Sequence, residues 1–315
     1  MLPFSKTAPA IVLVTLAALG ICQEGGDRTF RADTRLVVLH ASVVDKNGRL
    51  LTNLKEDSFK VFEDNVQQPL KNFRREDVPV SLGLIVDNSG SMRDKRKKVE
   101  AAALAMIKAS NPQDEVTVVN FNDELYQDVL FTNDMRKLEE GIARLDSRGG
   151  TAMRDAISAT IDYMKAKAKH DKKVIVIITD GDDNASAMTL EKLIGKAQQT
   201  EILCYSVGLL SEEEKREARR AKRALEALAE ATGAASIFPK ETADVEQATL
   251  QFAHEIRNQY MLAYTPTNPT LDGTFRKIRI AVNGPGKPVA RTRTGYYATP
   301  EAKKSAQVTQ SSSSR

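Results

Sequence analysis

Aromatic residues, cysteine and histidine are scarce in this sequence of 315 residues. It has no tryptophan, aromatic residues make up 5%, and there are only two cysteines and three histidines. The scarcity of aromatics leaves no sequence candidate for an aromatic hot spot at a protein interface. His40, His170 and His254 lie far apart, with no Cys or His at the spacing of zinc ligands, which argues against a zinc site.

The two cysteines exclude an intramolecular disulfide framework. Residues 1–22 contain one basic residue, Lys6, and then an uncharged apolar run over 8–21, which is the architecture of a secretory signal peptide. Cys22 ends this segment, and Leu19-Gly20-Ile21-Cys22 is similar to a bacterial lipobox, although bulky Ile21 stands where a small residue is expected. Whether Cys22 is removed or carries a lipid, Cys204 has no partner, and the apolar stretch 202–207 around it predicts a buried core residue.

The predicted export signal also indicates where the protein is located. The apolar run is shorter than the roughly 20 residues that a transmembrane helix needs. We therefore expect a protein that is secreted or located in the periplasm or cell envelope, with no transmembrane helix in the mature chain.

No strong charge of one sign is present. The 46 Lys and Arg against 42 Asp and Glu leave a net charge of +4, which gives no electrostatic reason to expect a nucleic acid as partner. The charged run over 212–223 starts acidic and continues basic, which favours a solvent-facing helix over a nucleic-acid-binding arm. No repeat of about 20 to 50 residues is found, so solenoids and propellers are set aside.

The middle of the chain alternates between two hydrophobic patterns. Almost continuous apolar runs, typical of buried parallel strands, occupy residues 80–86, 174–178 and 202–207. Apolar residues at helical spacing lie between and after them, at 99–107, 153–164, 190–197, 220–232 and 245–256. This alternation predicts an α/β fold: a doubly wound, mostly parallel sheet flanked by helices.

Both flanks of this region have short strands and turns. Strands are expected within 36–62 before it and within 260–297 after it, so a small antiparallel sheet is predicted. Residues 311–315 are almost pure serine, and the tail 299–315 is predicted to be disordered.

Three polar segments follow or precede the predicted elements at one edge of the parallel sheet. Asp87-Asn-Ser-Gly-Ser91 follows the first apolar strand, Gly149-Gly-Thr151 opens a helix, and Thr179-Asp-Gly181 follows the second strand. Open α/β sheets bind ligands where strand ends face helix N-termini. Carboxylates and hydroxyls are oxygen ligands, which Mg²⁺ prefers. The candidate metal ligands are Asp87, Ser89, Ser91, Thr151 and Asp180.

These five positions resemble the metal-ion-dependent adhesion site of von Willebrand factor type A domains, and the resemblance covers residues 80–258. It implies a Rossmann-like A domain over 79–258 that binds Mg²⁺ or Mn²⁺ and engages an Asp or Glu carboxylate of a protein partner. The flanks are similar to the secreted bacterial group called VWFA-related acidobacterial domains. That likeness implies one discontinuous accessory β domain built from residues 34–78 and 259–298. In it, the β segment before the A domain and the Tyr-rich hairpin after it, which contains segments 260–264 and 295–297, pair into one sheet.

Other functions remain open at this stage. An alternative function is that of a structural scaffold of an envelope assembly, in which a metal only holds loops together. A metal-dependent phosphohydrolase of the haloacid dehalogenase class is less favoured, because Ser89 stands where that class needs a second Asp. No Gly-x-Ser-x-Gly motif of serine hydrolases occurs either. Asp182 and Asp183 are read as solvated loop carboxylates in preference to ligands of a second ion.

Overall fold

The computed structural model describes residues 36–75, 77–143, 148–210 and 215–300. All of them belong to one compact unit. The expected signal segment 1–22, with Cys22, and residues 301–315 of the expected tail lie outside these ranges. No helix within the described ranges is long and apolar enough to cross a membrane.

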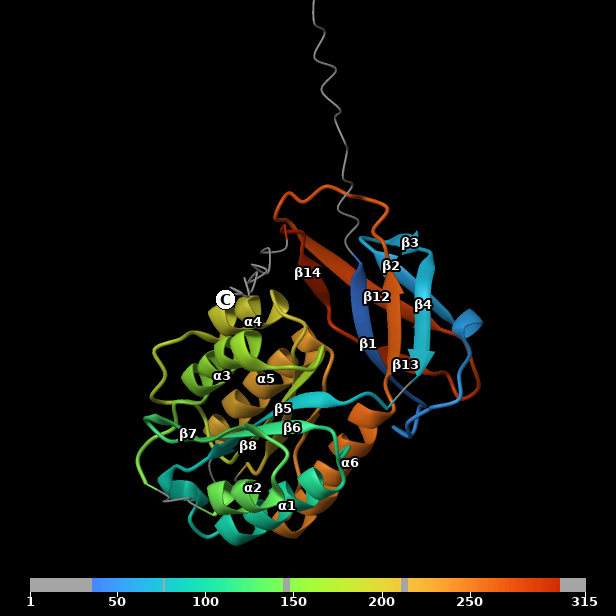
Figure 1. Cartoon of the computed structure of the whole chain (residues 1–315). Helices are drawn as coiled ribbons and strands as arrows, with labels where there is room; N and C mark the ends of the chain where they lie inside the picture. Colours follow the sequence, from blue (N-terminus) through green and yellow to red (C-terminus); the bar gives the residue numbers. More distant parts are fainter. Residues whose placement is uncertain (1–35, 76, 144–147, 211–214, 301–315) are drawn as a thin grey trace, which may run out of the picture. The chain divides into compact units, whose positions relative to one another are not determined.

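A six-stranded sheet with strand order β10-β9-β8-β5-β6-β7 forms the centre of the α/β part (Figure 1). Neighbouring strands are parallel, except that β6 and β7 pair antiparallel. Every residue of β5 is buried, as expected for a strand covered on both faces. The strands are β5 (Val80–Asp87), β6 (Glu115–Phe121), β7 (Leu125–Thr132), β8 (Lys172–Thr179), β9 (Leu203–Gly208) and β10 (Ser236–Ile237).

Helices cover both faces of this sheet, which confirms the predicted doubly wound fold. One hydrophobic cluster joins α1, α2 and α6 to one face, and a second joins α3, α4 and α5 to the other. On α3, Met153, Ile157, Ile161 and Met164 recur at helical spacing and are all buried. The helices are α1 (Arg96–Lys108), α2 (Met135–Ile142), α3 (Met153–Lys167), α4 (Leu190–Gln198), α5 (Lys215–Thr232) and α6 (Val245–Arg257).

Cys204 on β9 is confirmed as a buried core residue. It is a free cysteine, and burial raises the pKa of its thiol to about 12. A thiol that stays protonated at neutral pH is a poor nucleophile, so this side chain serves packing.

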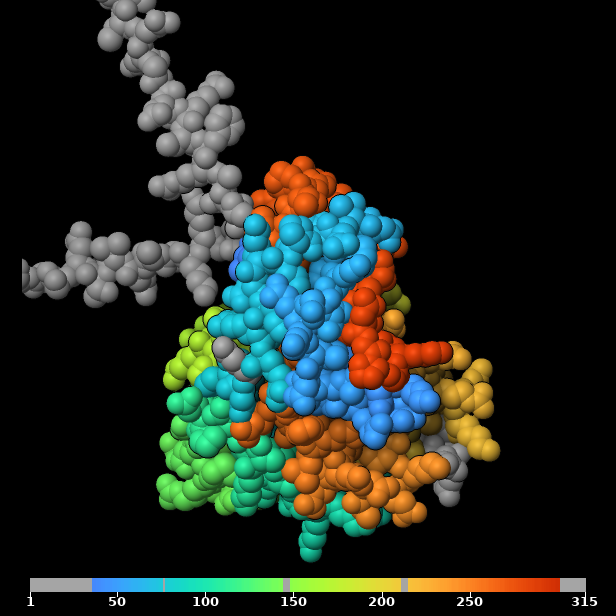
Figure 2. All heavy atoms as spheres, turned by 90° about the vertical axis from the view of Figure 1, so that its right-hand side faces the viewer, coloured from blue at the N-terminus to red at the C-terminus, as the bar shows by residue number. Residues whose placement is uncertain are grey.

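Two antiparallel four-stranded sheets are built from residues on both sides of the α/β part, with strand orders β13-β1-β11-β4 and β14-β12-β2-β3. β1 pairs with β11, and β2 pairs with β12, so each sheet joins strands from before and after the α/β part. These strands alternate in the first sheet, whereas in the second the two N-terminal strands are neighbours and so are the two C-terminal ones. Figure 2 shows atoms of the N-terminal flank, in blue to cyan, beside atoms of the C-terminal flank, in orange and red. The strands are β1 (Val37–Val44), β2 (Phe59–Glu63), β3 (Val66–Gln68), β4 (Leu70–Arg75), β11 (Tyr260–Tyr264), β12 (Phe275–Val282), β13 (Val289–Arg291) and β14 (Gly295–Tyr297).

The strands before and after the α/β part pair with one another, but the prediction that they form one sheet is wrong, because they form two. β11 lies between β1 and β4 in one sheet, whereas β14 pairs with β12 in the other. The two sheets share a core that includes Tyr260, Tyr264 and Tyr296. These large rings are therefore buried in one core although β11 and β14 are not hydrogen-bonded to each other.

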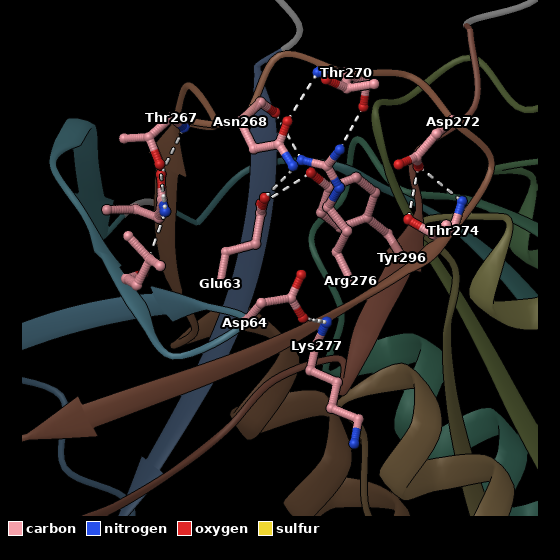
Figure 3. Close-up of polar contacts among 12 residues, drawn as sticks. Glu63, Asp64, Thr267, Asn268, Thr270, Asp272, Thr274, Arg276, Lys277 and Tyr296 are labelled. Atoms are coloured by element: carbon pink, nitrogen blue, oxygen red, sulfur yellow. Dashed lines mark hydrogen bonds and ion pairs between the residues drawn. The ribbon is translucent and has the colours of Figure 1, made fainter.

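A buried ion pair holds a loop over these sheets (Figure 3). Glu63 and Arg276 are 3% and 2% exposed, and Arg276 Nη1 donates to Glu63 Oε1 at 3.0 Å. The hydroxyls of Tyr264 and Tyr296 donate to Glu63 Oε2 at 2.7 and 2.9 Å. The same guanidinium donates to backbone carbonyl oxygens of the 268–270 segment. Each charged group thus has several hydrogen-bonding partners, which offsets the cost of its burial.

A second buried carboxylate connects α6 to strands of both parts of the fold. Glu255 on α6 accepts hydrogen bonds from Ser42 Oγ at 2.7 Å and Tyr205 OH at 3.1 Å. Arg291 Nη2 on β13 donates to the other carboxylate oxygen at 2.6 Å. The last helix is therefore attached through one side chain to β1, β9 and β13.

Candidate functional site

The candidate site is built at the ends of two adjacent strands of the six-stranded sheet. β5 and β8 pair in parallel, with Val86 opposite Ile178, so β5 ends at Asp87 beside the end of β8 at Thr179. Both strands end where their apolar runs give way to polar residues. This register brings the first and third of the predicted segments to the same edge of the sheet.

Asp87 is almost completely buried, at 1% exposed. Its oxygens accept hydrogen bonds from the backbone N–H of Ser89 at 2.8 Å and from Thr179 Oγ1 at 2.5 Å. Burial raises the pKa of Asp87 to about 6, while the hydrogen bonds from Thr179 and Ser89 act to lower it and the nearby charge of Asp180 adds to the rise. At neutral pH the ionised form still prevails.

Ser89, Ser91 and Asp180 form a continuous chain of polar contacts. The two serine hydroxyl oxygens lie 3.1 Å apart, and Ser91 Oγ donates to Asp180 Oδ1 at 2.7 Å. Asp180 is also buried, and its other oxygen, Oδ2, accepts a hydrogen bond from the Lys95 ammonium. The 3-10 turn η2 (Gly90–Met92) between Ser89 and α1 brings both hydroxyls toward the end of β8.

Thr151 reaches the same edge through a loop that depends on glycine. Gly149 has a φ of +77°, a conformation that favours glycine, and a Cβ added there would lie 2.0 Å from Asp123 Oδ1, so that the exposed Asp123 carboxylate would have to move. The loop is held against the first segment by a hydrogen bond from Gly90 N–H to Gly149 O at 3.3 Å. A Cβ added to Gly181 would lie 3.7 Å from Thr151 Oγ1, which places this hydroxyl against the backbone that follows Asp180.

All five predicted residues therefore gather at one edge, and direct side-chain contacts join Ser89, Ser91 and Asp180. Thr151 forms hydrogen bonds through its backbone: its N–H donates to Asn184 Oδ1 at 3.0 Å, and its carbonyl accepts from the N–H groups of Asn184 and Ala185 at 3.1 and 3.2 Å. That the five residues bind a metal stays a prediction.

Three further site residues were missed from the sequence. Thr179 belongs to the third motif, and its position as the last residue of a strand was the available signal. Lys95 lies in a basic run with no local mark that singles it out, and Asn184 lies in an irregular loop. Contacts of these residues with Asp87, Asp180 and Thr151 join segments that lie between 33 and 92 positions apart.

The interpretation of Asp182 and Asp183 as solvated loop carboxylates is wrong. The Asp183 side chain is 5% exposed and accepts hydrogen bonds from the backbone N–H and guanidinium of Arg154 at 2.7 and 3.0 Å. Asp182 pairs with Arg220 at 2.6 Å. Asp183 thus caps the start of α3, where the free N–H groups of a helix favour a carboxylate.

The donor set fits a hard divalent cation by chemistry and spacing. Ligands at about 2.0 to 2.1 Å in an octahedron place neighbouring oxygens about 2.9 Å apart. The distances of 3.1 Å between the serine hydroxyl oxygens and 2.7 Å between Ser91 Oγ and Asp180 Oδ1 are close to that spacing. Within the described ranges there is no group of three or more His, Cys, Asp and Glu side chains that could hold a metal. A site here would rest on two carboxylates supplemented by hydroxyls.

Comparison with known proteins places this edge in a recognised domain. The sequence model of the von Willebrand factor type A domain matches residues 82–182. Human integrin alpha-11 is 30% identical over 107 residues, which cover 31% of this chain and 9% of the integrin. The matched part of this chain thus spans about a tenth of the integrin's length.

Solved structures with similar folds were also found. A von Willebrand factor type A protein from Catenulispora acidiphila is 13% identical, with a TM-score of 0.49, over 76% of this chain and 75% of that one. The vWF domain of the type V pili tip protein Mfa5 from Porphyromonas gingivalis is 14% identical, with a TM-score of 0.48, over 57% of this chain and 95% of that one. The family match over residues 82–182 contains Asp87, Thr151 and Asp180. Residues 82–182 of the chain therefore have the sequence pattern of a von Willebrand factor type A domain.

Proposed function

We propose that this chain is an exported binding protein that uses Mg²⁺ or Mn²⁺, held by Asp87, Ser89, Ser91, Thr151 and Asp180, to engage an acidic group on a protein partner. The observation that carries the proposal is the clustering of buried Asp87 and Asp180 with three hydroxyls at one sheet edge. When bound, the cation supplies a positive centre with a coordination position open to an external carboxylate.

The residues of the chain have separate tasks in this proposal. Asp87 and Asp180 supply the negative charge, and their burial keeps water from competing for them. Ser89, Ser91 and Thr151 supply neutral oxygens, which hold an ion without cancelling its charge, so that attraction for a partner carboxylate remains. Thr179 holds Asp87 in place through its 2.5 Å hydrogen bond.

The proposed setting is outside the cytoplasm, since residues 1–22 have the pattern of an export signal. The partner is proposed to be a protein and not a nucleic acid, because the net charge of +4 is small for a chain of this length. We propose binding and not catalysis as the role of the site. Turnover of a generic phosphate ester that disappears in Asp87→Ala would contradict this.

The test is calorimetric titration of Mg²⁺ and Mn²⁺ into the purified chain, with folding checked by circular dichroism. Saturable binding at one site is expected for the wild type, with loss of at least about tenfold in affinity in Asp87→Ala. Asp94→Ala is the matched control, because Asp94 is an exposed carboxylate in the same segment. A folded wild type that binds neither ion would overturn the metal site.

The partner chemistry is tested next with an immobilised Glu-containing peptide. Binding of the metal-loaded chain that is abolished by a chelator, without unfolding, supports engagement of a carboxylate. Strong thermal stabilisation by the metal without any peptide binding would favour the scaffold function in its place.

A further inference from the structure

Lys95 makes a contact at the candidate site that no ligand pattern predicts. It precedes α1, and its ammonium donates to Oδ2 of Asp180. The side chains of Lys95 and Asp180 are 27% and 1% exposed, so the carboxylate is buried and the lysine side chain is partly exposed. An ion pair in such surroundings is screened less by water than a pair on the surface.

The ammonium differs from the other groups around Asp180 in what it can do. Ser91 donates its proton to Oδ1 but keeps lone pairs that can face a cation. An ammonium has three donors and no acceptor, so Lys95 cannot be a metal ligand. The Lys95 ammonium lies beside Oδ2 of Asp180, the oxygen that Ser91 does not contact. Its positive charge repels any other cation that approaches the carboxylate.

We propose that Lys95 is an internal counter-charge that competes with the divalent cation for Asp180 and thereby sets the metal affinity of the site. This inference rests on the proposed metal site. Binding of the ion requires the ammonium to withdraw from Asp180 along its flexible stem, and the partly exposed position of Lys95 gives it solvent to withdraw into. The contact thus holds Asp180 neutralised and ordered until a cation replaces the ammonium.

The test compares Mn²⁺ and Mg²⁺ affinity in Lys95→Gln and in the wild type by calorimetry. The glutamine amide can still donate to Asp180, so the substitution removes the charge and keeps a donor. Binding about tenfold tighter is expected in Lys95→Gln. The control, Lys97→Gln, removes the same charge from an exposed position two residues away and should stay within about twofold of the wild type.

A double-mutant cycle separates competition for Asp180 from a general charge effect. In an Asp180→Asn background, Lys95→Gln should change Mn²⁺ affinity by less than about threefold, because the competing carboxylate is gone. Equal affinity of Lys95→Gln and wild type would overturn the inference and leave the metal site standing. Weaker binding in Lys95→Gln would overturn it too, since Lys95 would then hold Asp180 in position for the metal. If none of the folded chains binds either ion, the proposed metal site itself falls.

Discussion

Replacement of Glu63 by alanine is expected to be the most destabilising single change in the two antiparallel sheets. The carboxylate accepts three side-chain hydrogen bonds, from Arg276, Tyr264 and Tyr296, at 2.7 to 3.0 Å. Burial raises the pKa of the Tyr264 hydroxyl well above its ordinary value, so this group stays a proton donor and is left without its acceptor in the variant.

The magnitude follows from the burial of both charges. Breaking a buried ion pair by removing one partner costs about 3 to 5 kcal/mol, because the other charge is left uncompensated. Arg276 keeps its contacts with the carbonyl groups of Asn268 and Thr270, which reduces the loss, while the two phenol hydroxyls increase it. We expect Glu63→Ala to lower the free energy of unfolding by about 4 kcal/mol. Glu63→Gln should cost about half as much, because its carbonyl oxygen still accepts hydrogen bonds.

The assay is urea unfolding of the full chain, followed by near-ultraviolet circular dichroism. Since the protein has no tryptophan, this signal comes mainly from tyrosines, including Tyr264 and Tyr296 in the affected core. Glu56→Ala is the control, because Glu56 is exposed in the turn just before β2, and it should change the free energy by less than about 0.5 kcal/mol. A cost below about 1 kcal/mol for Glu63→Ala would refute the argument from burial.

Three further predictions concern the site loop, the acid response and α6. Gly149→Ala should lower the free energy of unfolding by about 2 kcal/mol and weaken Mn²⁺ binding, because the new Cβ meets Asp123. The control is Gly48→Ala, since Gly48 has a similar φ but open space around it. This variant should lower the free energy of unfolding in urea by about 1 kcal/mol or less and leave Mn²⁺ binding unchanged. Burial, followed by the charges of Lys172, Arg293 and Lys173, lowers the pKa of His40 to about 3. As the pH drops below about 6.5 toward 3, His40 binds a proton in the unfolded chain but not in the folded one, so the free energy of unfolding falls. His40→Gln should remove up to about 1 kcal/mol per pH unit of this loss, as measured by urea unfolding at pH 7 and 5. An unchanged pH dependence in the variant would refute this prediction. Glu255→Ala should cost about 3 kcal/mol in the same assay, because it leaves Ser42, Tyr205 and Arg291 without a common acceptor, and a loss within about 0.5 kcal/mol would contradict that role.

The order of elements in the α/β part could be predicted because it depends on local hydrophobic patterns. β5, β8 and β9 are almost continuous apolar runs, and α3 repeats its apolar residues at helical spacing. β6 was not predicted although every residue of it is buried, since Glu115 and Thr117 interrupt its pattern. Both are satisfied by distant groups: Ser81 Oγ donates to Glu115, and Thr117 Oγ1 donates to the carbonyl of Val129. No local window of sequence contains those partners.

The candidate site shows the same division. Motifs placed Asp87, Thr151 and Asp180 at strand ends and a helix start, because the carboxyl ends of parallel strands meet at one edge. Their contacts with Thr179, Lys95 and Asn184 join segments far apart in the chain. Similarly, turn and strand patterns predicted antiparallel flanks, but the division into two sheets, with β11 and β14 apart, depended on which faces pack into the shared core.

The sequence by itself determined the class of fold, the edge at which polar groups gather and the chemical type of those groups, since each follows from periodicity or from residues adjacent in the chain. Only the tertiary structure decided which charges face one another: Lys95 with Asp180, Arg154 with Asp183, and Arg276 with Glu63. The physical reason is that burial and electrostatic pairing depend on distances in space, which the packing of the sheets and helices sets and neighbouring residues do not.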